Sequence, residues 1–183
     1  VNWTLARGWN GLENMALIPG TVGACPIQNI GAYGAEVAEF IETVEAYNRS
    51  TGQFKRLGNA DCGFGYRDSR FKREIDEWVI CAVEFRLDKN RPLKMNYAGI
   101  AEELAAMAVD TPTALHLAEA ISRIRTRKLP NPDLVGNAGS FFKNPIVADA
   151  YAERFLAQYP GAPVFPSGQA GSRKLSAAWL IEQ

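Results

Sequence analysis

The sequence predicts an α+β protein, and three observations support this prediction. Residues 37–57 have the pattern of a β-hairpin, with partly alternating segments at 40–47 and 53–57 around a polar, glycine-containing turn at 48–52. Residues 78–87 alternate in the manner of a half-buried strand. Apolar residues at helical spacing then predict helices over 98–108, 111–128, 149–158 and 174–183.

The strand at 78–87 has the clearest β pattern. Its polar face carries Glu84 and Arg86, and its apolar face is expected to carry Val79, Cys81, Val83, Phe85 and Leu87. The period of two follows from the geometry of a strand, in which successive side chains point to opposite faces.

The helix at 111–128 has the clearest start signal. Thr111 is expected to be its N-cap and Pro112 to lie in its first turn. His116 is interpreted as a structural or surface residue. Core positions are expected on three of the four helices. They are Leu117, Ile121 and Ile124 here, Ile100, Leu104 and Met107 in 98–108, and Ala152, Phe155 and Leu156 in 149–158.

Composition excludes several classes of function. Twenty basic residues balance 20 acidic ones, so no general attraction to nucleic acid or membranes is expected. A single histidine leaves little material for a His-based metal site or a Ser-His-Asp triad. No apolar run is long enough to span a bilayer. The three cysteines lack metal-type spacing and are interpreted as reduced thiols of a cytoplasmic protein, at Cys25, Cys62 and Cys81.

Residues 1–34 form a glycine-dense stretch with six glycines. Bare backbone at this density lets amides approach a phosphate or a flat ring closely. The stretch does not match the dinucleotide fingerprint, because the order strand, Gly-x-Gly-x-x-Gly, helix does not occur. A loop-rich structural segment is the alternative interpretation.

Two basic features could meet an anion. Arg67 lies between Tyr66 and Asp68, which could hold it toward a ligand; otherwise 61–73 is a surface loop with solvated charges. A second cluster of basic residues lies at the C-terminal end of the helix at 111–128. It could stabilise the helix dipole, or it could form a basic entrance to a site for a phosphate-bearing ligand. Its members are Arg123, Arg125, Arg127 and Lys128.

Residues 136–145 read Gly-Asn-Ala-Gly-Ser-Phe-Phe-Lys-Asn-Pro and bring a hydroxyl, an ammonium and an amide into one short loop. Gly136 and Gly139 permit backbone geometry that side chains forbid, and Pro145 ends any regular element. Ser140 is therefore a candidate reactive group. A glycine-rich turn with a buried Phe pair is the alternative.

A domain boundary is expected near 88–98, dividing the chain into 1–97 and 98–183, and 129–136 is a second candidate. Val1 begins inside sequence that has the pattern of folded structure, and Gln183 ends a helix pattern without a stop signal. We therefore expect the sequence to be a piece of a longer protein.

Five motifs together resemble one family. They are Gly-Leu-Glu-Asn-Met-Ala-Leu-Ile-Pro-Gly-Thr-Val-Gly at 11–23, Pro-Ile-Gln-Asn-Ile-Gly-Ala-Tyr-Gly at 26–34, Phe-Gly-Tyr-Arg-Asp-Ser at 64–69, Lys-Leu-Pro at 128–130, and the loop 136–145. In order and spacing they resemble UDP-N-acetylenolpyruvoylglucosamine reductase, the MurB family, over nearly the whole chain. The resemblance implies the later part of a vanillyl-alcohol-oxidase-like FAD-binding domain over 1–97 and part of a MurB-type α/β substrate-binding domain over 98–183.

The resemblance also implies an activity. The family binds FAD, takes a hydride from NADPH, and reduces the enolpyruvyl group of a UDP-sugar to give UDP-N-acetylmuramate for peptidoglycan. Ser140 matches the family's proton donor, and Arg67 matches the cation beside the carboxylate of the developing enolate. A cytoplasmic monomer with a UDP-sugar as partner is implied, without nucleic acid or membrane.

Other residues match the family by position. The substrate-lining matches are Tyr66, Tyr97, Lys128, Asn144 and Lys174. The flavin-facing matches are Pro19, Gly20, Val22, Gly23, Ala24, Asn29, Ile30, Gly31 and Ala32. No metal site is implied.

The sequence departs from the family pattern in four places. Phe165 stands where many relatives carry a tyrosine that reaches the substrate diphosphate, and Ala178 replaces a usual glycine. The family's Gly-Gly-Gly-Ser-Asn flavin phosphate loop and its C-terminal catalytic glutamate are not in this sequence. A non-catalytic UDP-sugar-binding module is the alternative function, and nucleic-acid binding through 123–128 is a weaker one.

Overall fold

The structure, a computed structural model, describes residues 1–131, 134–136 and 141–183. Helices and strands are mixed in it, so the predicted α+β class is confirmed. The chain forms two compact units, Val1–Gly136 and Asn137–Gln183. The boundary between the two units falls at the end of the second candidate boundary, 129–136. The boundary between an FAD-binding and a substrate-binding domain at 97/98 stays a prediction.

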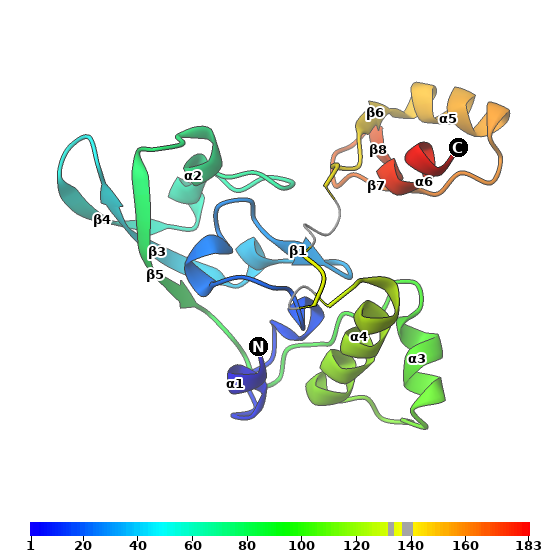
Figure 1. Cartoon of the computed structure of the whole chain (residues 1–183), viewed down its shortest axis with the longest axis horizontal. Coiled ribbons are helices and arrows are strands. Elements are labelled where there is room, and N and C mark those ends of the chain that lie inside the picture. The colour runs from blue at the N-terminus through cyan, green and yellow to red at the C-terminus, as the bar shows by residue number, and fades with distance from the viewer. Residues whose placement is uncertain (132–133, 137–140) are drawn as a thin grey trace. The chain divides into compact units, whose positions relative to one another are not determined.

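The first unit is built on an antiparallel sheet with strand order β4-β3-β5 (Figure 1). Its strands are β3 (Ile41–Asn48), β4 (Gln53–Gly58) and β5 (Trp78–Phe85). The predicted hairpin is confirmed, because β3 and β4 pair around a turn in which the Thr51 amide donates to Asn48 Oδ1 at 2.8 Å. Gly52 completes this turn with φ of 70°, a conformation that favours glycine.

A β-bulge in β5 changes which side chains face the core. Glu45 of β3 pairs with Ala82, and the next residue, Ala46, pairs with Ile80, so Cys81 is the extra residue. The core face therefore switches and comprises Trp78, Ile80, Val83, Phe85 and Leu87. The expected single apolar face was right for Val83, Phe85 and Leu87 and wrong for the exposed Val79 and Cys81.

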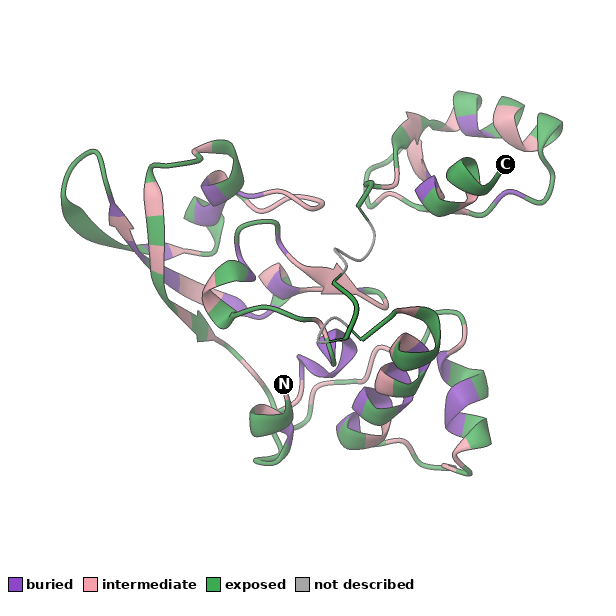
Figure 2. Cartoon of the chain, in the orientation of Figure 1, coloured by how far each residue is buried: buried purple, intermediate pink, exposed green. Residues whose placement is uncertain are grey.

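One face of this sheet covers the main hydrophobic core, whose buried residues appear in Figure 2. Short elements pack around it, namely α1 (Asn2–Leu5), η1 (Glu13–Met15), η2 (Val22–Ala24), β1 (Gly31–Ala32), β2 (Ala35–Glu36), η3 (Val37–Glu39), η4 (Ala60–Cys62) and α2 (Arg70–Arg73). β1 and β2 pair with each other as a small separate ribbon. The expected loop at 61–73 therefore contains a short helix, because Ser69 caps it by accepting from the Lys72 amide at 3.3 Å.

A helical pair builds a second hydrophobic cluster in the same unit. Helices α3 (Ile100–Ala106) and α4 (Ala114–Lys128) lie side by side (Figure 1) and bury their expected apolar stripes. The expected cap was wrong by two residues, since Thr113 rather than Thr111 is the N-cap of α4. Its Oγ1 accepts from the His116 amide at 3.3 Å, and His116 Nδ1 accepts from the Thr113 amide, which gives the histidine a structural role.

The second unit is a small antiparallel sheet with strand order β6-β8-β7, accompanied by two helices. The strands are β6 (Ile146–Ala148), β7 (Val164–Pro166) and β8 (Ser172–Leu175), and the helices are α5 (Asp149–Gln158) and α6 (Ala177–Glu182). The expected helix at 149–158 is confirmed, with Ala152 fully buried. The expected helix at 174–183 starts later, because residues 172–175 pair on both edges as β8 and Ser176 caps α6.

The cysteines are free thiols; Cys25 and Cys62 are buried, and Cys81 is exposed. Within the described residues, no helix has the length and apolar character needed to cross a membrane. Those same residues contain no group of three or more His, Cys, Asp or Glu side chains placed to hold a metal ion.

Candidate active site

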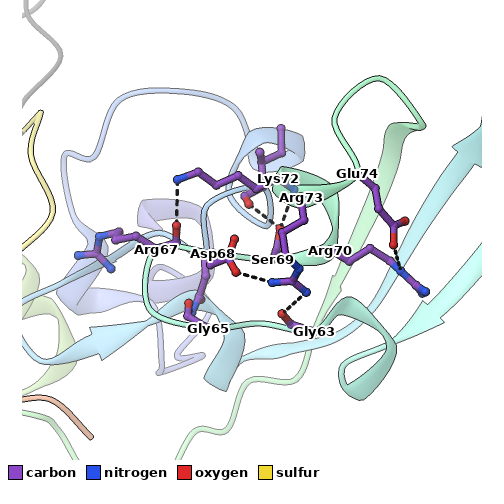
Figure 3. A network of polar contacts seen from close by, with 11 residues as sticks. Gly63, Gly65, Arg67, Asp68, Ser69, Arg70, Lys72, Arg73 and Glu74 are labelled. Carbon is purple, nitrogen blue, oxygen red and sulfur yellow. Dashed lines mark hydrogen bonds and ion pairs between the residues drawn. The ribbon is translucent and has the colours of Figure 1, made fainter. Parts of the chain in front are cut away.

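Arg67 lies at the tip of a tight two-residue turn. The amide of Gly65 donates to the Asp68 carbonyl at 2.9 Å, and the Asp68 amide donates back at 3.1 Å, which closes the turn. Arg67 takes φ of 52°, an unusual value for a residue with a long side chain and one found at ligand-binding positions. Lys72 Nζ donates to the Arg67 carbonyl at 3.0 Å, so the strained main chain is fixed from α2 (Figure 3).

The base of the turn is held by a network that leaves the Arg67 side chain out. Asp68 forms an ion pair with Arg73, whose Nη2 also donates to the Gly63 carbonyl at 3.0 Å. In Figure 3 the Arg67 guanidinium points away from this pair. Asp68 therefore does not hold the Arg67 guanidinium, contrary to expectation, although the Tyr66 ring lies 5.3 Å from the guanidinium carbon.

The Arg67 guanidinium instead contacts the small ribbon β1–β2. Nη2 donates a hydrogen bond to the Gly31 carbonyl, and Nη1 lies 3.6 Å from Oε1 of Glu36. Nη1 is buried, and it makes no hydrogen bond to any of the described residues. A buried cationic N–H without an acceptor is unfavourable in a folded protein, so this atom has the capacity to bind an anionic oxygen.

Asn29 fixes the segment that receives the arginine. The residue is buried, and its Nδ2 donates at 2.9 Å both to Glu36 Oε2 and to the Gly65 carbonyl. Its Oδ1 accepts from the Ala38 amide at 3.0 Å. Because both ends of the amide are engaged, Asn29 can offer a cofactor its main chain but has no free side-chain group. Sequence reasoning missed Glu36, whose only sequence signal is a carboxylate following the motif at 26–34.

The predicted flavin-facing loop presents apolar side chains to solvent. Val22 is 59% exposed and Ile27 is 41% exposed. Pro19, Gly20 and Ala24 are also exposed, whereas Gly23, Ile30, Gly31 and Ala32 are partly buried. A hollow of about 310 Å³ lies beside the loop, lined by Thr21, Gly23, Ala24, Ile27, Phe71, Trp78 and Ile80. Clustered exposed apolar groups next to a hollow are typical of a surface that is covered by a ligand or by other protein.

Tyr97 joins a second polar group on the first unit. Its ring packs edge-on against Tyr33 at a centroid distance of 5.2 Å. Burial raises the pKa of the Tyr33 phenol, and Arg125, which is hydrogen-bonded to that phenol, acts in the opposite direction. Lys128 is exposed at the C-terminal end of the same helix, α4. The structure thus brings Tyr97 next to Tyr33, and Tyr33 next to Arg125, a residue that sequence reasoning placed only in a basic cluster.

The other members of that basic cluster have carboxylate partners. Arg123 Nε lies 2.7 Å from Glu119 Oε1, and Arg127 pairs with Glu103 of α3. The hydrogen bond from Arg127 holds the pKa of the Glu103 carboxyl below its usual range. Arg123 therefore pairs within α4 and Arg127 links α4 to α3, while the dipole-stabilising interpretation of the cluster stays a prediction.

The second unit carries the remaining described candidates. Asn144 Oδ1 accepts from the Ala177 amide at 2.9 Å, which ties it to the start of α6. Lys174 lies in the central strand β8, directly opposite Phe165 of β7. Opposed residues share a face of an antiparallel sheet, so Phe165 is a neighbour of Lys174. Ser140 lies outside the described residues.

Comparison with curated proteins gives a consistent result. The chain is 56% identical over 189 aligned residues to the UDP-N-acetylenolpyruvoylglucosamine reductase of Xanthomonas euvesicatoria pv. vesicatoria (strain 85-10), covering all of this chain and 54% of that protein. It is 55% identical over 183 residues to the reductase of the same name from Xylella fastidiosa (strain 9a5c), with 52% of that protein covered. The chain belongs to the UDP-N-acetylenolpyruvoylglucosamine reductase (MurB) family.

The chain spans about half the length of the curated MurB relatives that it matches. A crystal structure of UDP-N-acetylenolpyruvylglucosamine reductase (MurB) from Thermus caldophilus superimposes with a TM-score of 0.56 at 23% identity, over 99% of this chain and 60% of that one. At this identity the likeness concerns the fold alone. No family model matches the chain.

Proposed function

We propose that this chain is the central part of a flavin-dependent reductase that acts on the enolpyruvyl group of a UDP-sugar and forms UDP-N-acetylmuramate. The observation that carries the proposal is the anchored Arg67, whose buried Nη1 has hydrogen-bonding capacity left for an anionic oxygen. A substrate carboxylate provides such an oxygen. The same turn belongs to one of the motifs that place the chain in the MurB family.

The residues present fit an FAD-binding role for part of the first unit. Bare backbone at Gly31 receives the guanidinium directly, since a Cβ there would lie 2.8 Å from Arg67 Nη1. The exposed apolar loop and its hollow offer a surface for a flat ring. FAD would lie against Pro19, Gly20, Val22, Gly23, Ala24, Asn29, Ile30, Gly31 and Ala32, and would supply the hydride that NADPH provides.

Arg67 would bind the carboxylate of the enolpyruvyl group. When hydride adds to one carbon of the double bond, negative charge spreads over the other carbon and its carboxylate. A guanidinium held beside that carboxylate stabilises the charge as it develops, which is where a fixed cation is most effective. Ser140 would donate the proton to the carbanion, because a strongly basic enolate accepts a proton even from a weak acid such as a hydroxyl.

The other candidates would bind the remainder of the substrate. Tyr66 and Tyr97 would line it, and Lys128 would offer an ammonium to the diphosphate. Asn144 and Lys174 would contribute an amide and an ammonium. Phe165, opposite Lys174, lacks the hydroxyl that many relatives offer, so we propose one diphosphate contact fewer on this strand pair.

The experiment that tests the proposal uses the full-length protein that carries this sequence. Substrate-dependent NADPH oxidation should fall about 1,000-fold or more in Ser140→Ala, since one positioned proton donor contributes about 100- to 10,000-fold. Flavin content should be unchanged. Arg67→Ala should lower turnover by about 100-fold, the usual effect of removing one stabilising donor from a developing anion.

The outcomes separate this proposal from a UDP-sugar-binding module. Near-wild-type turnover in Ser140→Ala would remove the serine from the proton-donor role, and unchanged turnover in Arg67→Ala would remove the arginine. Binding of the UDP-sugar by a protein that holds no flavin and oxidises no NADPH would favour the binding module. We further propose that the protein is a cytoplasmic monomer in peptidoglycan precursor synthesis, which its mass in solution and cell fractionation would check.

A further inference from the structure

We propose that Glu36 is a positioning residue for Arg67, and that Asn29 holds Glu36 in place for this task. The inference rests on the proposed function, because it assigns a role to a residue that acts through Arg67. It adds to that function a carboxylate on the ribbon β1–β2 which is not among the residues matched to the family's site.

The geometry places two anchors on one guanidinium. The Gly31 carbonyl accepts from Nη2, and the Glu36 carboxylate lies 3.6 Å from Nη1. Both anchors are on the same short ribbon, where Gly31 pairs directly with Glu36. A guanidinium is planar, so contacts at two of its nitrogens fix its orientation as well as its distance.

Glu36 is itself held from two sides. Asn29 Nδ2 donates to its Oε2 at 2.9 Å, and the Glu39 amide donates to its side chain in a capping box. Asn29 also binds the Gly65 carbonyl, at the base of the turn that carries Arg67. Glu36 and the Arg67 turn are therefore tied to the same buried amide, and their relative position is set independently of the ion pair.

Stability does not explain this arrangement. The side chain of Arg67 is 28% exposed and that of Glu36 is 37% exposed, and ion pairs at this exposure contribute little to folding. A carboxylate that orients a reacting group, in contrast, has a large effect on the rate, because small displacements of the group lower turnover strongly. We therefore assign Glu36 to the orientation of Arg67.

The test is a double-mutant cycle in the full-length protein with Glu36→Gln and Arg67→Lys. Glutamine keeps one oxygen that can accept from Asn29 Nδ2 and replaces the other by an amide NH2 that cannot accept from Arg67, so the variant should fold and lose this anchor. We expect Glu36→Gln to lower kcat about 10-fold, with KM for the enolpyruvyl UDP-sugar changed less than about 3-fold. In the Arg67→Lys background the same change should cost less than about 2-fold, because the guanidinium it positions is gone.

A matched control removes the same charge elsewhere. Glu42 pairs with Arg86 on the sheet, and Glu42→Gln should leave kcat unchanged. An equal loss from Glu36→Gln in both backgrounds would overturn the proposal, because Glu36 would then act independently of Arg67. Higher turnover in Glu36→Gln would overturn it too, since Glu36 would then be neutralising the cation.

A second readout does not depend on activity. Nitrogen-15 NMR of arginine side chains, with the Arg67 signal identified as the one that Arg67→Lys removes, reports how that guanidinium is held. We expect Glu36→Gln to shift the Arg67 signal and to speed rotation of the guanidinium, and Glu42→Gln to leave both unchanged. An unaltered Arg67 signal in Glu36→Gln would contradict the positioning role. A wild-type protein that oxidises no NADPH but shows the expected NMR change would refute the proposed function and retain the contact.

Discussion

Substitution of Gly31 by alanine tests how closely the ribbon β1–β2 and the Arg67 turn are packed. An added Cβ would lie 2.7 Å from the Ala35 carbonyl oxygen, 2.8 Å from Arg67 Nη1 and 3.0 Å from Glu36 Cγ. The two side chains can withdraw, but the carbonyl belongs to the paired strand and cannot move without opening the ribbon. The substitution should therefore destabilise the first unit by steric overlap.

The expected magnitude follows from two opposing contributions. Overpacking costs about 1–3 kcal/mol, and alanine recovers about 0.4–1 kcal/mol by restricting the unfolded chain. The net loss is about 1–2 kcal/mol, which lowers the urea midpoint by about 0.5–1 M when the denaturant slope is about 2 kcal/mol per molar. Urea unfolding of the chain, monitored by far-ultraviolet circular dichroism, measures this midpoint.

Gly23→Ala is the matched control for this substitution. Gly23 lies in the same glycine-dense stretch, and its added Cβ would meet its nearest atom, the Ile80 carbonyl oxygen, at an ordinary 3.7 Å. Neither glycine has the positive φ that would strain alanine. A Gly31→Ala midpoint within about 0.2 M of wild type would refute the close approach of the Ala35 carbonyl to Gly31 within this ribbon.

Three further predictions concern stability and titration. Asn29→Ala should lower the free energy of unfolding by about 3 kcal/mol or more. It leaves the buried hydrogen-bond partners of Asn29 unsatisfied and places alanine at φ of 45°. The control substitution at the exposed Asn90, Asn90→Ala, should change the free energy of unfolding little. Thr113→Ala should cost about 1 kcal/mol and Thr111→Ala less, since Thr113 caps α4; equal losses would contradict the cap. Burial raises the pKa of the Cys25 thiol to about 12 and that of Cys62 to about 11, from an ordinary value of 9.0. The folded state therefore favours the neutral thiols. Their contribution to the free energy of unfolding should be full below about pH 9 and should be lost as the pH rises toward 12. Replacing both cysteines by alanine should make the free energy of unfolding decline less steeply over this alkaline range.

The sequence predicts those elements whose signals are local. The hairpin at 37–57 follows from alternation and a glycine turn, and the stripe of α4 follows from helical spacing. The cap of α4 was misplaced because Thr111 and Thr113 both flank Pro112, and propensity alone does not decide between them. The bulge at Cys81 has no local signal, since it depends on how β5 pairs with β3.

The site was predictable in its residues and not in its contacts. Resemblance to the family selects Arg67. The residues that hold its guanidinium depend on how β1–β2 folds against the Arg67 turn, and Gly31 and Arg67 are 36 residues apart in the sequence. The neighbouring Asp68 was the natural local partner, and it pairs with Arg73 instead. Long-range contacts of this kind leave no periodic pattern in a single sequence.

The most direct test of the account is an assay of the full-length protein for NADPH oxidation, with and without the enolpyruvyl UDP-sugar. We expect a yellow protein that oxidises NADPH rapidly only when this substrate is present, and whose substrate-dependent rate falls about 100-fold in Arg67→Ala. A flavin-bound, folded protein that shows no oxidation dependent on the enolpyruvyl UDP-sugar would contradict the account.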